Sequence, residues 1–285
     1  MPRIAVLQMT SGIDPWSNFE TIRDAAYEAK KGGAEVLFTP EMSLLLDRDR
    51  KRAAEHIVEQ HASRYVKMLS NIAEECNLWI ALGSMAVALP EGRWANRSML
   101  FPPSGEQPVC YDKMHMFDVN LSDGENWRES NAYRPGDKPV AKDILLLRMT
   151  DAGEEEEEED FKLGLTVCYD IRFPALFDAL GREGCDVISI PAAFTVPTGT
   201  AHWHVLQRAR AIEASAFVVA AAQVGEHADG RRTYGHSLVV DPWGEVLLDM
   251  GGEEPGLGFA DIDLARIAEV RAQVPSLANR REIAN

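Results

Sequence analysis

The sequence predicts a single α/β domain in which two β-sheets pack face to face, with helices outside them. Three observations support this fold class. Apolar strand-like runs alternate with amphipathic helical segments along the 285-residue chain, and no change in composition marks a second domain. The strand-like runs outnumber the helical segments, which favours two sheets. The chain is 46% apolar and 26% charged, which is typical of a globular domain.

The first half of the chain is expected to contain alternating strands and helices followed by a hairpin. Residues 3–9 predict a buried strand, and residues 18–34 predict an amphipathic helix that ends at a pair of glycines. The next elements are a strand over 35–41, a helix over roughly 51–76, a strand over 78–89 and hairpin arms over 96–105 and 109–113. Residues 114–140 are rich in Asp, Asn, Gly and Pro, and the length of this irregular stretch indicates a functional loop or a covering segment.

The second half repeats the alternation after an acidic hairpin. The segment "DAGEEEEEED" at 151–160 joins strands over 143–150 and 161–170, and its glutamates must stay solvated because they repel one another. We therefore expect an exposed hairpin tip there. The later elements are a helix over 175–185, a strand over 186–194, a helix over 202–215, strands over 217–224, 236–244 and 245–250, and a C-terminal tail at about 270–285.

Charge and composition exclude several classes of protein. The net charge of −16 argues against a nucleic-acid partner, because phosphate recognition needs clustered Lys and Arg. No stretch approaches the roughly 18 to 20 apolar residues of a membrane span, and the N-terminus lacks a signal-peptide pattern. The four cysteines lie far apart, which favours free thiols over disulfides or a zinc site. We therefore expect a cytoplasmic protein that does not associate with membranes, and small molecules stay open as partners.

Three strands end in a reactive side chain. Glu41 follows "VLFTP", Lys113 follows "PVCYD", and Cys168 follows "LGLTV". The carboxyl ends of strands are where α/β proteins build their sites. A thiol must lose its proton before it attacks; Glu41 could accept that proton and pass it to a leaving amine, while Lys113 could stabilise an oxyanion. The three residues together predict acyl transfer with a cysteine nucleophile.

Each of the three residues also has an ordinary structural interpretation. Cys168 could be a small buried apolar residue, Glu41 a surface acid at a strand end, and Lys113 a solvated loop cation. Their common position at strand ends is what favours the catalytic interpretation over these alternatives.

Along nearly its full length, the chain resembles the nitrilase superfamily of carbon–nitrogen hydrolases. The matching stretches are "FTPEMSL", "YDKMHMFDV" and "GLTVCYDIRFPALFDAL", which carry Glu41, Lys113 and Cys168 at the positions of that family's catalytic triad. A further match, "WRESNAYRPGD", assigns the role of a supporting second glutamate to Glu129. The resemblance implies a four-layer αββα sandwich and a thioester intermediate on the cysteine. No Gly-rich phosphate cradle appears in the sequence, so we expect no cofactor.

The region from "PAAFTVPTGTAHWH" to "YGHSLVVDPWGEV" resembles the deaminated-glutathione amidase branch, which is close to the ω-amidases. This branch implies hydrolysis of the amide of a small carboxylated molecule, with release of ammonia, by a homodimer or a higher homo-oligomer. Two reactions of the same triad stay open as alternatives, namely hydrolysis of N-carbamoyl amino acids and of nitriles. A non-catalytic binding or scaffold protein with the same fold is the alternative from another class.

Four further residues are candidates for substrate binding. The backbone N–H of Tyr169 is expected to help hold the oxyanion. Arg172 could bind a substrate carboxylate, or it could pair with Asp170 or another local acid. Phe117 and Phe194 could line the pocket or pack in the core.

The histidines do not predict a metal site. His202 and His204 lie two residues apart in a helical segment, so their side chains point in different directions and cannot easily share one ion. His115 is expected as a hydrogen-bonding neighbour of the site, and His236 is expected to order a loop. We therefore predict no metal ligand.

Overall fold

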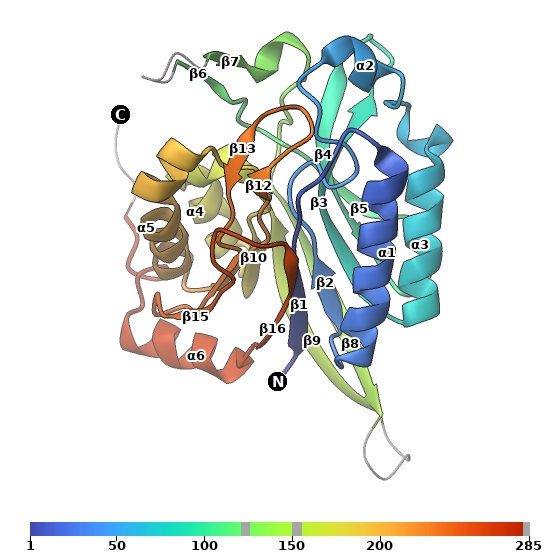
Figure 1. The fold of residues 1–285 in the computed structure, drawn as a ribbon. Helices are drawn as coiled ribbons and strands as arrows, with labels where there is room; N and C mark the ends of the chain where they lie inside the picture. Colours follow the sequence, from blue (N-terminus) through green and yellow to red (C-terminus); the bar gives the residue numbers. More distant parts are fainter. Residues whose placement is uncertain (121–125, 150–155, 282–285) are drawn as a thin grey trace.

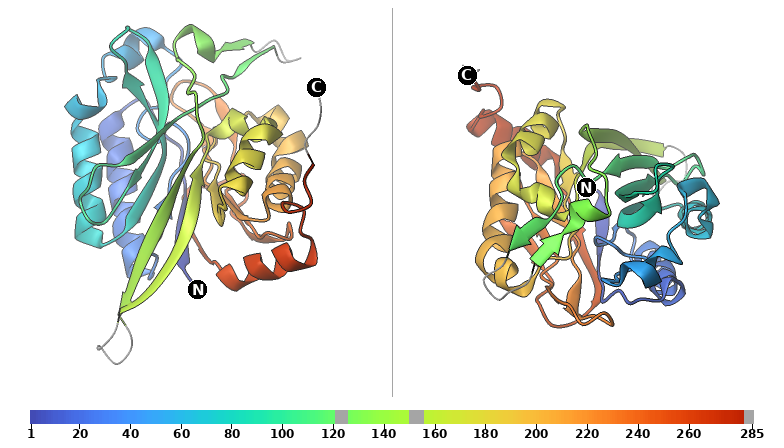
Figure 2. Two further views of the ribbon diagram at one scale, coloured as in Figure 1. Left: turned by 180° about the vertical axis from the view of Figure 1, so that it is seen from behind. Right: turned by 90° about the horizontal axis from the view of Figure 1, so that it is seen from above.

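The computed structural model describes residues 1–120, 126–149 and 156–281 and arranges them in four layers. Two six-stranded sheets pack against each other, and helices cover the outer face of each (Figure 1, Figure 2). The predicted α/β class and the αββα sandwich are confirmed. None of the helices in the described residues combines the length and the hydropathy that a bilayer crossing requires.

The first sheet has the strand order β16-β1-β2-β3-β4-β5. Its strands are β1 (Arg3–Gln8), β2 (Val36–Phe38), β3 (Trp79–Ala88), β4 (Trp94–Phe101), β5 (Val109–Asp112) and β16 (Gly256–Asp261). Helices α1 (Pro15–Lys31) and α3 (Arg64–Cys76) cover its outer face. Side chains of β1 alternate between two hydrophobic layers: Val6 packs toward the second sheet, and Leu7 packs toward the helices. Both faces of this sheet are therefore buried.

The second sheet has the strand order β15-β14-β11-β10-β9-β8. Its strands are β8 (Val140–Met149), β9 (Glu156–Leu165), β10 (Val187–Ser189), β11 (Phe217–Ala220), β14 (Leu238–Val240) and β15 (Val246–Asp249). The central strands β9, β10 and β11 are parallel, so their carboxyl ends share one edge. Helices α4 (Pro174–Arg182) and α5 (Val196–Ala214) cover the outer face.

Short elements gather at the edge where the parallel strands of both sheets end, which is the upper edge in Figure 1. They are the ribbons β6 (Asp118–Asn120) with β7 (Asn126–Arg128) and β12 (Val224–Glu226) with β13 (Arg232–Tyr234), and the 3₁₀ helices η2 (Glu129–Asn131) and η3 (Cys168–Arg172). A parallel bridge between Met9 and Gln223 connects the two sheets at this edge. The segments that follow β2, β5 and β9 therefore approach one another.

The helix predicted over 51–76 is wrong as a single element. The chain forms α2 (Arg50–Ala54), the 3₁₀ helix η1 (Gln60–Ala62) and α3 instead. Between α2 and η1, Ile57 packs into a small hydrophobic cluster with Leu45 and Ala86, and the carbonyl of Val58 accepts a hydrogen bond from the N–H of Ala88. These contacts with the end of β3 require an extended connection that a continuous helix cannot supply.

Other boundaries also differ from the prediction. Helix α5 begins six residues earlier than expected because a proline stands in its first turn, where the missing N–H costs nothing. The strand predicted over 186–194 ends at Ser189. The predicted helix over 18–34 begins at Pro15, because Asp14 accepts hydrogen bonds from the N–H groups of Trp16 and Ser17 and caps it.

Several elements have no counterpart in the prediction: the short elements β6, β7 and η2 within the irregular stretch, and β13, β16 and α6 (Leu264–Gln273). Two glycines in β16 weaken the sequence pattern of a strand. The segment nevertheless forms a strand because it pairs antiparallel with β1. Helix α6 includes the start of the predicted C-terminal tail. Beyond this helix the chain packs against α4, where Arg280 forms an ion pair of 2.7 Å with Asp178.

The acidic hairpin is only partly described. Strand β9 begins at Glu156 and pairs with β8 as far as Met149, so the strand includes part of the acidic run. Residues 150–155 lie outside the described residues. The exposed tip at 151–160 stays a prediction.

Candidate active site

Cys168 is the first residue of η3, at the strained turn that follows β9. Its backbone is left-handed, with φ of 50°, which is uncommon for a residue with a side chain. The turn is held firmly: the N–H of Cys168 donates to the carbonyl of Pro191 at 2.8 Å, and the N–H of Val167 donates to the Asp170 carboxylate at 2.9 Å. Strain that persists because the surroundings fix it is common at functional sites.

Asp170 connects this turn to the first sheet. Its carboxylate accepts hydrogen bonds from the Tyr111 hydroxyl and from His115, each at 2.7 Å. Asp170 therefore does not form the ion pair with Arg172 that the sequence left open as an alternative. His115 also stacks on Phe173, with ring centroids 3.6 Å apart, which agrees with its expected role as a hydrogen-bonding neighbour of the site.

Glu41 follows β2 and is almost fully buried, at 6% exposure. Its Oε1 accepts hydrogen bonds from Lys113 Nζ at 2.9 Å and from Asn96 Nδ2 at 3.0 Å. Its Oε2 accepts from the backbone N–H of Ala193, which belongs to the second sheet's side of the site, at 3.0 Å. The carboxylate is therefore fixed by both halves of the molecule.

Lys113 follows β5 and has 2% exposure. Its ammonium lies 2.9 Å from Glu41 Oε1 and 2.9 Å from Glu129 Oε2. Glu129, in η2, also accepts a hydrogen bond of 2.7 Å from the N–H of Phe117. The structure thus brings together all four residues that the sequence nominated for catalysis, including the glutamate from the long irregular stretch.

The sequence reasoning missed Asn96. This residue of β4 is 1% exposed, and its amide nitrogen donates to both Glu41 and Glu129 at 3.0 Å. It therefore holds the two carboxylates at a fixed separation. One signal in the sequence could have identified it: Asn96 is a polar residue within the strand "WANRSMLF". A buried polar side chain of this kind indicates hydrogen-bonding partners in the core.

The charges of the site set the protonation of each group. Burial raises the pKa of Glu41, but the Lys113 ammonium and hydrogen bonds from Cys168 and Asn96 outweigh burial and lower it below the usual value. Burial lowers the pKa of Lys113, but the charges of Glu129 and Glu41 raise it well above its usual value. Burial and then the charge of Glu41 raise the pKa of the Cys168 thiol well above its usual value, against the opposing effect of Lys113. A neutral thiol therefore faces an ionised carboxylate and an ammonium.

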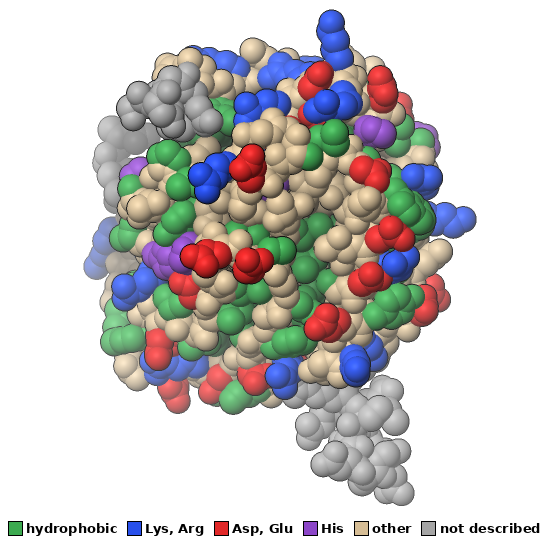
Figure 3. Space-filling view, viewed as in Figure 1, with side chains coloured by type: hydrophobic (Ala, Val, Ile, Leu, Met, Phe, Trp, Pro, Cys, Tyr) green, Lys and Arg blue, Asp and Glu red, His purple; other side chains and the backbone are tan. Residues whose placement is uncertain are grey.

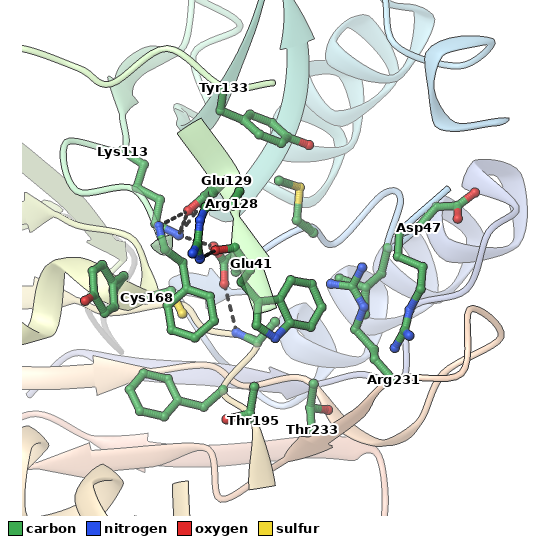
Figure 4. Close-up of a pocket in the computed structure, with 18 of the residues that line it drawn as sticks. Glu41, Asp47, Lys113, Arg128, Glu129, Tyr133, Cys168, Thr195, Arg231 and Thr233 are labelled. Atoms are coloured by element: carbon green, nitrogen blue, oxygen red, sulfur yellow. Dashed lines mark hydrogen bonds and ion pairs between the residues drawn. The ribbon is translucent and has the colours of Figure 1, made fainter. Parts of the chain in front are cut away.

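These groups lie at one side of a cavity of about 420 Å³. Figure 4 shows Cys168, Lys113, Glu41 and Glu129 together, with Arg231 across the cavity from them. Of the predicted substrate-binding residues, Phe117, Tyr169 and Phe194 line the cavity. The cavity also has lining residues that the sequence reasoning missed: Trp94, Trp127, Tyr133, Thr195, Thr198, Thr233 and the arginines Arg48, Arg50, Arg128, Arg231 and Arg232.

Arg172 does not line the cavity. Its guanidinium lies over the rings of Tyr169 and Phe194, 5.8 and 5.4 Å from their centroids, and 3.3 Å from His202 Nδ1. It therefore packs behind two of the residues that do line the cavity.

A four-layer αββα frame that encloses a thiol with two carboxylates and one ammonium defines a class of cysteine hydrolases. The chain belongs to the carbon–nitrogen hydrolase family, whose family model matches residues 3–272. It is therefore an enzyme that hydrolyses carbon–nitrogen bonds, and the alternative of a non-catalytic scaffold is not supported.

Individual relatives agree with this assignment. The chain is 37% identical over 280 residues to deaminated glutathione amidase of Synechocystis sp. (strain PCC 6803 / GT-S), and the matched region covers 97% of each protein. It is 38% identical over 288 residues to the Homo sapiens deaminated glutathione amidase, covering 99% of this chain and 83% of the human one. Saccharomyces cerevisiae Nit3, a member of branch 10 of the nitrilase superfamily, has a TM-score of 0.80 at 26% identity, covering 96% of this chain and 94% of Nit3. The resemblance to the nitrilase superfamily is confirmed.

Proposed function

We propose that the enzyme hydrolyses the amide of a small carboxylated molecule, releasing ammonia through a thioester on Cys168. The observation that carries this proposal is the buried contact of Glu41 with Lys113 beside the thiol at a strand–helix turn. The relatives named deaminated glutathione amidase support an amide of that kind as the substrate class.

In the first half of the reaction, Cys168 attacks the amide carbonyl as its proton passes to Glu41. The raised pKa of the thiol and the lowered pKa of Glu41 mean that the proton moves during attack, because a resting thiolate beside Glu41 is unfavourable. The Lys113 ammonium and the N–H of Tyr169 stabilise the oxyanion; Tyr169 is in the first turn of η3, where N–H groups lack partners within the helix. Glu41 then protonates the departing ammonia.

In the second half, water attacks the thioester carbonyl. Glu41 accepts a proton from this water, the C–S bond breaks, Glu41 returns the proton to the departing thiolate, and the acid product forms. Glu129 supports the step by holding Lys113 and the loop at Phe117 in place, which its ion pair of 2.9 Å and hydrogen bond of 2.7 Å favour.

Arginines near the cavity support a carboxylate on the substrate. Five line it, and basic side chains gather along the upper edge of the molecule in Figure 3, although the chain as a whole is strongly acidic. A guanidinium binds a carboxylate through two parallel hydrogen bonds. We assign Phe117, Tyr169 and Phe194 to the apolar part of the substrate, and Arg172 to the support of the last two rings.

The test is ammonia release by purified protein from deaminated glutathione, α-ketoglutaramate and N-carbamoyl-β-alanine, with Cys168→Ala as the blank. We expect the first substrate to be turned over fastest and the variant to lose at least about 10³-fold in kcat. Carbon dioxide released with the ammonia would identify a carbamoyl substrate and overturn the amide assignment. Turnover that survives in Cys168→Ala would overturn the mechanism.

We further propose that the enzyme is a cytoplasmic homodimer. The reducing cytoplasm suits a chain whose four cysteines are all free. Apolar side chains stand exposed on α5 and on the adjacent β15: Val205 at 62%, Ile212 at 49% and Leu247 at 44%. Helix α5 contacts the turn between β14 and β15, because Arg208 donates a hydrogen bond of 2.7 Å to the carbonyl of Gly244. Exposed apolar side chains on two elements in contact fit a second copy of the chain.

A further inference from the structure

Outside the cavity, two histidines and an aspartate converge from three elements of the second sheet's side. His204 comes from α5, His236 from the turn before β14, and Asp249 from the end of β15. Figure 3 shows histidine and acidic side chains side by side on this part of the face. His204 Nε2 lies 3.0 Å from Asp249 Oδ2, and His236 Nδ1 lies 2.9 Å from Asp249 Oδ1. The three candidate ligand atoms all lie within 4.8 Å of one another.

The chemistry of this set suits a transition-metal ion. Two imidazole nitrogens and one carboxylate oxygen are ligands that Zn²⁺ and its neighbours bind well. Bond lengths of about 2.0–2.1 Å in a tetrahedral site separate ligand atoms by about 3.3 Å. The two nitrogen–oxygen distances run to different oxygens of Asp249 and need to open by about 0.3 Å to reach that value. A pair of ligand atoms as far apart as 4.8 Å has to close by about 1.5 Å, which a small rotation of the partly exposed side chains supplies. Each neutral imidazole would bind through the nitrogen that now faces Asp249 and keep its proton on the other nitrogen.

The surroundings hold these ligands in place. The carbonyl of His236 accepts a hydrogen bond of 2.7 Å from the indole of Trp203, the residue before His204. The N–H of Gly251 donates to Asp249 Oδ1 at 2.9 Å, and its carbonyl accepts from the N–H of His236 at 2.7 Å. Backbone and side-chain bonds therefore link all three elements before any ion binds, which lowers the cost of binding.

Charge and access also fit an ion. Burial raises the pKa of Asp249, but hydrogen bonds from His204, Gly251 and His236 outweigh burial and lower it, so the carboxylate is ionised. The side chains of His204, His236 and Asp249 are 36%, 25% and 34% exposed. In the single chain, solvent can therefore reach the cluster and complete the coordination.

We propose that His204, His236 and Asp249 bind one divalent transition-metal ion of the Zn²⁺ type, with water in the remaining position. The ion would cross-link α5 to β15 and to the turn before β14. The prediction of no metal ligand considered His202 as the partner of His204, and those two do point apart, since His202 contacts Arg172. The partners of His204 come instead from distant parts of the sequence.

The test is calorimetric titration of Zn²⁺ into the Cys168→Ala protein, which lacks the cavity thiol. We expect one ion per chain, and an affinity at least about tenfold weaker in each of His204→Gln, His236→Asn and Asp249→Asn. His236→Asn suits the left-handed backbone at this position, where φ is 55°, because asparagine tolerates it. His202→Gln is the matched control on the same helix and should keep the full affinity.

Folding and oligomeric state are checked by circular dichroism and light scattering, so that a misfolded variant is not scored. Zinc should raise the melting temperature of the parent and of His202→Gln but not of Asp249→Asn. Cobalt in place of zinc should give visible bands without the intense near-ultraviolet band of a thiolate ligand. Equal zinc affinity in parent and Asp249→Asn, equal loss in His202→Gln, or no binding at millimolar Zn²⁺ would overturn the proposal.

Discussion

At the scale of single residues, one ammonium between two carboxylates governs the site. Lys113 contacts Glu41 and Glu129, each at 2.9 Å, and the thiol of Cys168 lies against this set. Ionising the thiol would place a third negative charge beside a single positive one. The site therefore keeps the thiol protonated, and in the proposed mechanism its proton passes to Glu41 during attack.

Glu41→Gln should lower both kcat and the pKa of the Cys168 thiol, so that the thiol becomes more acidic while the enzyme becomes slower. Removing the carboxylate removes a base, so kcat should fall about 10²–10⁴-fold. It also removes a negative charge that raises the pKa of Cys168 while Lys113 remains, so that pKa should fall. The pH at which iodoacetamide alkylates the thiol at half-maximal rate should move down. Lys113→Met removes the opposing charge and should move it up; shifts of the same sign in both variants would contradict this account.

Asn96→Ala should affect catalysis through the carboxylates that Asn96 holds. A hydrogen bond to a charged group contributes about 1.5–3 kcal/mol, so kcat should fall about 10- to 100-fold with a smaller change in KM. Because the bond from Asn96 lowers the pKa of Glu41, its loss should raise that pKa and move the acidic limb of kcat/KM to higher pH. Ser98→Ala, two residues along the same strand, is the control. An unmoved acidic limb in Asn96→Ala would count against the positioning role.

At the scale of elements, the site depends on how closely strand ends approach. Gly83 of β3 lies where the chain leaves β2 toward Glu41. A Cβ at Gly83 would lie 2.1 Å from the Thr39 carbonyl oxygen and 2.5 Å from Pro191 Cβ, and Pro191 is the residue whose carbonyl holds the N–H of Cys168. Only glycine allows these three segments to touch.

Gly83→Ala should therefore destabilise the fold and disturb the site together. Overpacking against backbone atoms typically costs about 1–3 kcal/mol, which should appear as a lower denaturation midpoint in urea. Gly12→Ala is the control, because a Cβ there would meet nothing closer than 3.9 Å. A midpoint equal to that of the control would show that the contact relaxes without cost.

At the scale of the whole molecule, the site exists only because two sheets meet. Lys113 and Glu41 follow strands of the first sheet, whereas Cys168 follows a strand of the second, and Ala193 from the second sheet's side donates to Glu41 at 3.0 Å. The outer surface of the second sheet's helix layer is where we expect the second copy of the chain.

Val205→Glu combined with Ile212→Glu should convert the proposed dimer to a monomer. Dimerisation would bury the two introduced carboxylates in an apolar interface without partners. The free energy lost by burying these charges should exceed the free energy that the apolar contacts contribute to dimerisation. Light scattering after size-exclusion chromatography measures the mass. Val58→Glu is the control: this exposed apolar residue lies in the connection between α2 and η1, outside the proposed interface, so the variant should remain a dimer. A monomeric parent protein would refute the dimer directly.

The sequence by itself determined the α/β class and predicted the proposed nucleophile and its two charged partners, because strand periodicity and the residues at strand ends are local features. Glu129 was identified through its "WRESNAYRPGD" motif, although its contact with Lys113 spans 16 residues. Only the tertiary structure decided the role of Asn96, the arginine lining of the cavity, and the meeting of His204 with His236 and Asp249. Each of these depends on which elements pack together, and packing is set by contacts between residues far apart in the chain. For the same reason the helix predicted over 51–76 is broken by Ile57, whose burial against β3 and β4 outweighs its local helical pattern.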